Sequence, residues 1–297
     1  MQQPAQSSAS FAVTAVVPPG LEEVAAAELI ALGAEEVRPL RRAVALRTDL
    51  AGFYRLHLRA RLPFRFLREL ARFPCRGRAD LHLGVQNAAD WDRWLPPEAS
   101  FKVEASGSLP ELNHSHYTAL QVKNALVDLQ REHWGSRSMV NLEDPDLALH
   151  LHLSPGRPMG GSGGGRRIGK PGGGGTAILS LEGSGASLHR RGYRAAMGLA
   201  PLKENLAAGL IALTGWDGSV PLCDPLCGSG TLLIEAAAMA LNRAPGLLSE
   251  PGAASGTTPG SSASGVGASG AWTGVPGADG PLETPERRRP RRFGFER

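Results

Sequence analysis

The sequence pattern of residues 220–241 predicts a strand, a glycine turn and a helix in succession, and this stretch constrains the fold most. A short apolar run at residues 220–223 leads to Asp224, small residues form a turn at 227–230, and an Ala/Leu-rich helix is expected from Thr231. Glycines at 228 and 230 let the backbone approach a ligand closely, and the helix start offers unpaired N–H groups. The stretch therefore predicts a ligand site in an α/β unit.

The spacing of this turn excludes two common ligands. A dinucleotide fingerprint would continue to a third glycine at position 233, which is Leu233, and no lysine follows the turn as in a phosphate loop. A second glycine stretch, Gly164–Lys170, fits the phosphate-loop spacing, but Pro171 stands where Ser or Thr is needed. Spacing alone therefore leaves two interpretations of the turn at 227–230. It binds a nucleotide-like ligand, or it is a plain turn whose glycines allow close packing.

Three motifs in order narrow the choice. They are LHRRGYR at residues 188–194, APLKENLAA at 200–208 and DPLCGSGTLLIEAA at 224–237. Together they resemble the THUMP-domain RNA methyltransferases, specifically the bacterial group that methylates guanine N2 in 23S rRNA. The resemblance implies S-adenosylmethionine as the cofactor. It also implies a set of cofactor-binding residues: Asp224, Pro225, Cys227, Gly228, Ser229, Gly230 and Thr231.

The resemblance and the composition divide the chain into five parts. Residues 11–72 are expected to form a ferredoxin-like α+β lead-in, and residues 73–182 a THUMP RNA-binding domain with a Gly-rich insert at 155–175. Residues 183–245 would begin an α/β Rossmann-like methyltransferase domain. Residues 1–10 lack order signals. Residues 246–297 are mostly Gly, Ser, Ala and Pro and then charged, so we expect them to be largely disordered.

Hydrophobic periodicity predicts the main elements. Strands are expected at residues 11–17, 101–105, 147–153, 177–182 and 220–223, and near residues 44–46. Helices are expected at residues 21–32, 50–61, 116–133 and 201–213. The basic stretch at 73–82 is interpreted as a linker.

Arginines are concentrated in one part of the chain. Residues 36–78 hold 12 arginines against three acids, although the whole chain has a formal net charge of only +4. Such a basic stretch favours phosphate contact, and a solvated surface is the alternative. Residues 187–194 either contact RNA or brace the joint between domains. The residues proposed to contact RNA, either rRNA or tRNA, are Arg41, Arg42, Arg190, Arg191 and Arg194.

Other site classes receive no support. Three cysteines without a C-x-x-C pair argue against a disulfide framework and a zinc site, and Cys223 and Cys227 are interpreted as small packing residues. His150 and His152, or His114 and His116, have no third ligand of a suitable type nearby, so no metal is predicted. No apolar run of membrane-spanning length and no secretory signal is found, so we expect a soluble protein in the cytoplasm or an organelle matrix.

The catalytic loop that the resemblance implies is missing. Guanine-N2 methyltransferases of this kind hold the flipped base with an Asn/Asp-Pro-Pro-Tyr/Phe loop, and a search for that tetrapeptide finds none. We therefore predict no catalytic residue and expect the sequence to stop partway through its methyltransferase domain. Residues 195–245 would then be loosely packed, and the chain alone inactive. A non-catalytic THUMP RNA-binding protein and a tRNA methyltransferase fragment remain alternatives, and the oligomeric state stays open.

Overall fold

The computed structural model describes residues 9–156, 174–193 and 202–247, and its framework is one twisted sheet of eight strands. The strand order is β2-β3-β1-β4-β8-β7-β5-β6. Two separate apolar cores lie against this sheet, one at each end of the strand order. Most of three expected segments, the N-terminal residues 1–10, the Gly-rich insert 155–175 and the tail 246–297, lies outside the described residues, as do residues 194–201.

The first half of the sheet is a ferredoxin-like unit. Its elements are β1 (Phe11–Val16), α1 (Glu22–Ala31), β2 (Glu35–Leu40), β3 (Ala43–Thr48), α2 (Leu50–Arg59) and β4 (Arg65–Cys75). The strand β1 lies between β3 and β4 and is antiparallel to both, so that Val13 pairs with Leu46 on one side and Arg68 on the other. Asp49 caps α2 by accepting a hydrogen bond from the Gly52 N–H at 2.7 Å.

The second half continues the same sheet. Its elements are α3 (Arg78–Gln86), α4 (Trp91–Trp94), β5 (Ser100–Gly107), α5 (Ser115–Trp134), β6 (Met139–Val140), β7 (Leu147–Ser154) and β8 (Gly175–Glu182). In β7, Leu147, Leu149, Leu151 and Leu153 are buried, and the residues between them are less covered. This alternation puts one face of the strand on the core beneath α3 and α5. The other face carries His150 and His152.

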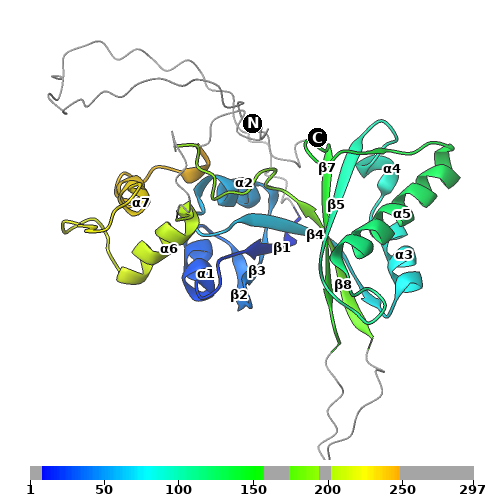
Figure 1. Ribbon diagram of the computed structural model, residues 1–297, viewed down its shortest axis with the longest axis horizontal. Helices are drawn as coiled ribbons and strands as arrows, with labels where there is room; N and C mark the ends of the chain where they lie inside the picture. The colour runs from blue at the N-terminus through cyan, green and yellow to red at the C-terminus, as the bar shows by residue number, and fades with distance from the viewer. Residues whose placement is uncertain (1–8, 157–173, 194–201, 248–297) are drawn as a thin grey trace, which may run out of the picture.

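The strand β4 joins the two halves. It pairs with β1 along residues 65–68 and with β8 along most of its length, from the Leu67–Glu182 pair to the Cys75–Gly175 pair. The proposed boundary between residues 72 and 73 therefore falls within a strand. Figure 1 shows the consequence of the sheet twist: β1 and β4 run across the view, whereas β7 and β8 run from its top toward its bottom.

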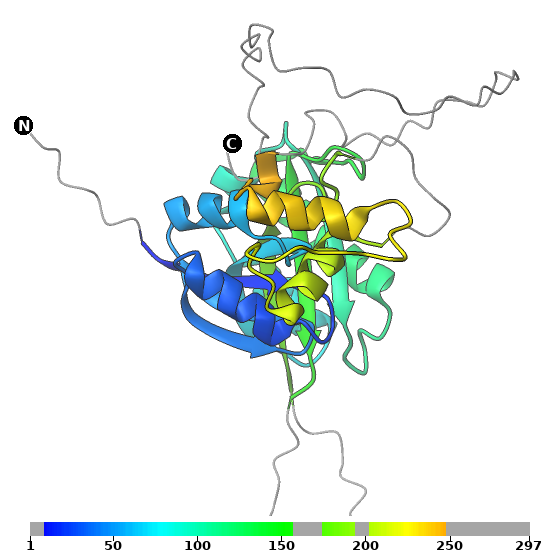
Figure 2. The ribbon, with the colours of Figure 1, turned by 90° about the vertical axis from the view of Figure 1, so that its left-hand side faces the viewer.

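A third part packs on the ferredoxin-like unit. It consists of α6 (Glu204–Thr214), α7 (Thr231–Ala240) and the short 3₁₀ turn η1 (Pro245–Leu247). The helix α6 contacts α1 and α7, and η1 contacts α2. Figure 2 shows α6 and α7 in front of the ferredoxin-like unit, on the side away from the second half. Gly209 allows the close approach, because a Cβ there would lie 2.3 Å from Leu21 Cδ1.

Most predicted elements are confirmed, with two exceptions. The expected linker at residues 73–82 is wrong, because it contains the end of β4 and the start of α3, whose Leu81 and Val85 fill the core. The expected strand at 220–223 is also wrong, since these residues have no strand conformation. A strand needs a hydrogen-bonded neighbour, and none of the described strands lies beside this run. No described helix is both long and apolar enough to cross a bilayer.

Candidate cofactor loop and its anchorage

The glycine turn lies at the start of α7, as the sequence predicts. Gly228 and Gly230 have φ of 52° and 72°, values that glycine adopts at little cost, and Gly230 is the N-cap of the helix. No side chain caps this N-terminus. Its first N–H groups are therefore available to a ligand, and the helix dipole favours an anionic one.

The loop leaves room for a ligand on its outer side. A Cβ built on Gly228 or Gly230 would meet no atom closer than 4.0 Å. The Asp224 carboxylate accepts the Leu226 N–H through Oδ1 at 3.0 Å, which holds the acid at the entry to the turn. These features fit the methionine end of S-adenosylmethionine, whose carboxylate suits the helix start and whose ammonium group suits Asp224.

The remaining predicted cofactor residues surround this turn. Pro225, Cys227 and Ser229 are exposed, whereas Thr231 is buried at the first turn of α7. Ser229 Oγ and Thr231 Oγ1 lie 3.1 Å apart. The interpretation of Cys223 and Cys227 as packing residues is wrong, because both side chains are exposed. Without an adjacent strand, nothing in the described chain covers them.

A buried carboxylate fixes α7 from its inner side. Glu235 is fully buried, and Tyr193 donates its hydroxyl to Glu235 Oε1 at 3.1 Å. Arg191 Nε lies 3.7 Å from Oε1, and Arg61 Nη1 lies 3.9 Å from Oε2. Burial raises the pKa of Glu235, while Arg191, Tyr193 and Arg61 act in the opposite direction. Sequence reasoning missed Glu235. The one signal that could have indicated its role is that it is a lone acid within an Ala/Leu-rich helix, since a buried acid needs partners.

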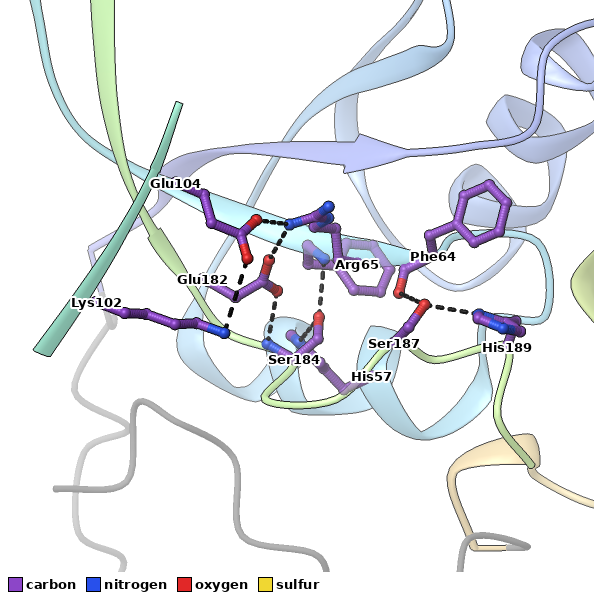
Figure 3. Close-up of polar contacts among 10 residues, drawn as sticks. His57, Phe64, Arg65, Lys102, Glu104, Glu182, Ser184, Ser187 and His189 are labelled. Carbon is purple, nitrogen blue, oxygen red and sulfur yellow. Dashed lines mark hydrogen bonds and ion pairs between the residues drawn. The ribbon is translucent and has the colours of Figure 1, made fainter. Parts of the chain in front are cut away.

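The segment at residues 183–191 binds along the start of β4. Gly183 and Leu188 donate their N–H groups to the carbonyls of Phe66 and Phe64, at 3.1 and 2.8 Å. Ser184 Oγ accepts the Phe66 N–H at 2.9 Å and lies 3.3 Å from His57 Nε2. Figure 3 shows Ser184 beside His57, and Ser187 between Phe64 and His189. The segment therefore delivers Arg191 to a fixed place beside α7.

Figure 3 also shows an ion network at the join of the two halves. Arg65 Nη1 contacts Glu104 at 2.8 Å and Glu182 at 3.2 Å. Lys102 Nζ adds a 3.8 Å ion pair to Glu104. Arg65, from the basic stretch, and Lys102, from β5, are therefore balanced by acids and are weak candidates for phosphate contact.

The five arginines predicted to contact RNA fall into three groups. Arg41 and Arg42, on the β2–β3 turn, and Arg190 are exposed. Arg191 is only 2% exposed, so its predicted RNA contact is wrong, because its guanidinium is directed into the cluster around Glu235. Arg194 lies outside the described residues. Of the two alternatives for residues 187–194, bracing the joint between domains describes Arg191, whereas RNA contact by the exposed Arg190 stays a prediction.

Comparisons with known proteins agree with this arrangement. Three family descriptions match in chain order: an RlmL ferredoxin-like domain at residues 12–67, a THUMP domain at 86–157, and an RMKL-like methyltransferase domain at 191–258. The chain belongs to the THUMP-domain methyltransferase family. Its motifs, its sheet and its glycine loop occur in the order that these three domains require.

Two similar relatives are bacterial. The chain is 44% identical over 232 residues to slr0064 of Synechocystis sp., named as a candidate RNA methyltransferase, covering 78% of this chain and 55% of that protein. It is 38% identical over 233 residues to the ribosomal RNA large subunit methyltransferase K/L of Vibrio campbellii, covering 78% of this chain and 30% of that protein. The chain thus spans about half, or less, of these relatives.

Two solved structures share the fold of this THUMP-domain chain. One, from Listeria monocytogenes, is titled a predicted N6-adenine-specific DNA methylase; it matches with a TM-score of 0.64 and 32% identity over 80% of this chain and 57% of that one. The other, SMU.472, is titled a candidate methyltransferase complexed with SAH; its TM-score is 0.63, with 27% identity over 81% of this chain and 58% of that one.

Proposed function

We propose that this chain supplies the RNA-binding surface and the cofactor loop of an S-adenosylmethionine-dependent methyltransferase acting on guanine N2 of 23S rRNA. The observation that carries the proposal is the open glycine turn at the uncapped start of α7, held on a body that also carries a THUMP domain. The K/L name of the Vibrio relative supports rRNA as the substrate, and the SAH in SMU.472 supports the cofactor.

The residues of the loop would hold the cofactor rather than react with it. When bound, S-adenosylmethionine supplies an activated methyl group. The first N–H groups of α7 would bind its carboxylate, and Asp224 would bind its ammonium group. Gly228 and Gly230 would let the backbone lie against the methionine chain. Arg41, Arg42 and Arg190 would contact RNA phosphates.

A glycine variant tests the cofactor half of this proposal. The Gly230→Val change places a β-branched residue at a φ of 72° and fills the space where the ligand would lie. We expect titration calorimetry with S-adenosylmethionine to show binding by the parent chain and at least about a tenfold loss in the variant, a 1.4 kcal/mol change. Gly215→Val, at a φ of 69° with no atom within 4 Å of a Cβ, controls for backbone strain. Equal affinity in parent and Gly230→Val would contradict the cofactor assignment.

The salt dependence of RNA binding tests the other half. Each phosphate neutralised by an arginine releases a counterion, so the logarithm of affinity falls with the logarithm of salt concentration, by about 0.7–0.9 per contact. Replacing Arg41 and Arg42 together by Ala should reduce that slope by about 1.5 in filter binding with an rRNA fragment. An unchanged slope would exclude the β2–β3 turn from the interface. If primer extension shows that a deletion strain retains every N2-methylguanosine in its 23S rRNA, a tRNA substrate would be favoured instead.

A non-catalytic RNA-binding role is the second candidate, and one observation favours it. Apolar side chains on α6, on α7 and just after it are exposed: Leu210, Leu213, Leu233, Ile234 and Leu241. These faces, together with the exposed glycine turn, have no covering layer within the described residues. We therefore propose that the 297 residues alone do not transfer methyl groups. Transfer of labelled methyl to rRNA by the purified chain, abolished by Gly230→Val, would refute this.

A further inference from the structure

A cluster of buried side chains connects α7 to the rest of the molecule, and its members come from four segments. Glu235 lies on α7, Arg191 and Tyr193 follow β8, Arg61 follows α2, and Glu28 lies on α1. We propose that Arg61 and Arg191 are positioning residues, which set the orientation of the cofactor helix relative to the RNA-binding sheet. The inference rests on the function proposed above for the glycine loop.

The first step of the argument is that both guanidinium groups are themselves fixed by backbone carbonyls. Arg191 donates through Nη1 to the Leu188 carbonyl and through Nη2 to the Arg61 carbonyl, both at 2.5 Å. These two bonds leave Nε directed at Glu235. A lysine has a single nitrogen on a flexible stem and cannot reproduce this planar arrangement.

The second step is that Arg61 holds α7 at a second point. Its Nη2 donates to the carbonyls of Ala238 and Arg243, at 3.1 and 2.6 Å, at the C-terminal end of the helix. Its Nη1 lies beside Glu235, one turn closer to the loop. Arg61 therefore contacts α7 both at Glu235 and at its C-terminal end. Two points of contact restrict the rotation of α7 relative to Arg61.

The third step is that the backbone carrying Arg61 is fixed by the ferredoxin-like unit and by α6. Glu28 accepts the N–H groups of Arg61 and Leu62 through its two oxygens, at 2.8 and 3.1 Å. Asn205 donates from Nδ2 to the Leu62 carbonyl at 3.0 Å. The backbone of Arg61 and Leu62 is thus held in place, and it leads directly into the strand β4, which both halves of the sheet share.

The cluster is better suited to orientation than to stability. Buried ion pairs stabilise proteins little compared with apolar residues of similar size. In the described part of the chain, Arg61 Nη1, Arg191 Nε and Glu235 Oε2 also lack a hydrogen bond. The arrangement instead fixes the orientation of α7. Because a helix rises about 1.5 Å per residue, a 10° tilt of α7 about Ala238 would move Gly230 by roughly 2 Å. A misplacement of about 1 Å can reduce a rate about 100-fold.

The test measures the orientation of α7 directly, without cofactor or RNA. Spin labels are attached to cysteines introduced at the exposed positions Leu233 on α7, five residues from Ala238 toward the loop, and Leu83 on α3, with Cys223 and Cys227 replaced by Ser. The native Cys75 is buried. Double electron–electron resonance then gives the distribution of distances between the helix and the second half of the sheet. The parent should show one narrow distribution.

The variants are Arg191→Lys, Arg61→Lys and Glu235→Gln, with the exposed neighbours Arg190→Lys and Arg59→Lys as matched controls. We expect the first three to broaden the distribution or shift it by about 1 Å, the displacement that a 10° tilt about Ala238 gives at Leu233, and the controls to leave it unchanged. Glu235→Gln keeps the shape of the side chain, so it remains informative where a lysine variant fails to fold. Variants that melt at lower temperature but keep the parent distribution would overturn the inference, because that result indicates stability alone.

The proposed function fails separately from this inference. A narrow parent distribution that the three variants broaden supports the positioning role whether or not the chain binds S-adenosylmethionine. If calorimetry shows no cofactor binding by the unlabelled chain with its native cysteines, the cofactor proposal is refuted, and the positioning role of Arg61 and Arg191 is not affected. Conversely, cofactor binding by a parent whose distribution is as broad as that of Arg191→Lys refutes the positioning role alone.

Discussion

Acidification should destabilise this protein through one histidine, His150, on the sheet face opposite α3 and α5. His150 pairs in register with Glu104 on β5 and Ser180 on β8, and its Nδ1 is buried without a hydrogen bond among the described residues. Burial lowers its pKa from 6.5 to about 4, with Arg65 and His152 acting in the same direction and Glu104 opposing them. The fold therefore favours the neutral ring.

The size of the effect follows from these two values. Between pH 6.5 and 4 the unfolded chain binds the proton and the folded chain does not, so stability is complete above pH 6.5 and falls as the pH decreases. A difference of 2.5 pKa units corresponds to about 3 kcal/mol below pH 4, and to about 2 kcal/mol on going from pH 7.5 to pH 5.

Urea unfolding at pH 7.5 and pH 5 measures this loss. Because burial also raises the pKa of Glu28, Glu182 and Glu235, the comparison is between the parent and His150→Gln, which has a polar side chain of similar size and no ring charge. The parent should lose about 2 kcal/mol more than the variant. The His116→Gln change on the exposed start of α5 controls for removal of an imidazole. An equal loss in the parent and His150→Gln would refute the reasoning.

Two further predictions concern packing and thiols. A Cβ on Gly107, at a φ of 75°, would lie 1.8 Å from the Leu153 carbonyl oxygen. Gly107→Ala should therefore cost more than about 3 kcal/mol in urea unfolding, whereas Gly185→Ala, at a φ of 66° with open space, should cost about 1–2 kcal/mol; similar costs would contradict the clash. Burial raises the pKa of Cys75 to about 11, and Cys223 and Cys227 are exposed. Ellman's reagent at pH 8 should therefore label two thiols rapidly and the third only after unfolding; three rapid thiols would contradict the burial.

The sequence by itself determined the features that depend on neighbouring residues. The glycine turn at 228–230 and the start of α7 could be predicted because the left-handed φ values and the unpaired helix N–H groups belong to adjacent positions. The alternation of β7 and the helical spacing of α5 were equally readable, since each element buries one face. The order of the three motifs along the chain then indicated the family.

The tertiary structure decided the features that depend on partners distant in sequence. Arg190 and Arg191 are the same residue type at adjacent positions, yet one is exposed and the other is buried against Glu235, 44 residues further on. Arg61 belongs to the basic stretch by composition but to the α7 joint by contact. The run at 220–223 has the apolar character of a strand without a pairing neighbour. A periodic pattern gives the face that an element buries, whereas ion pairs and strand pairing require two segments to meet, and only the folded chain brings them together.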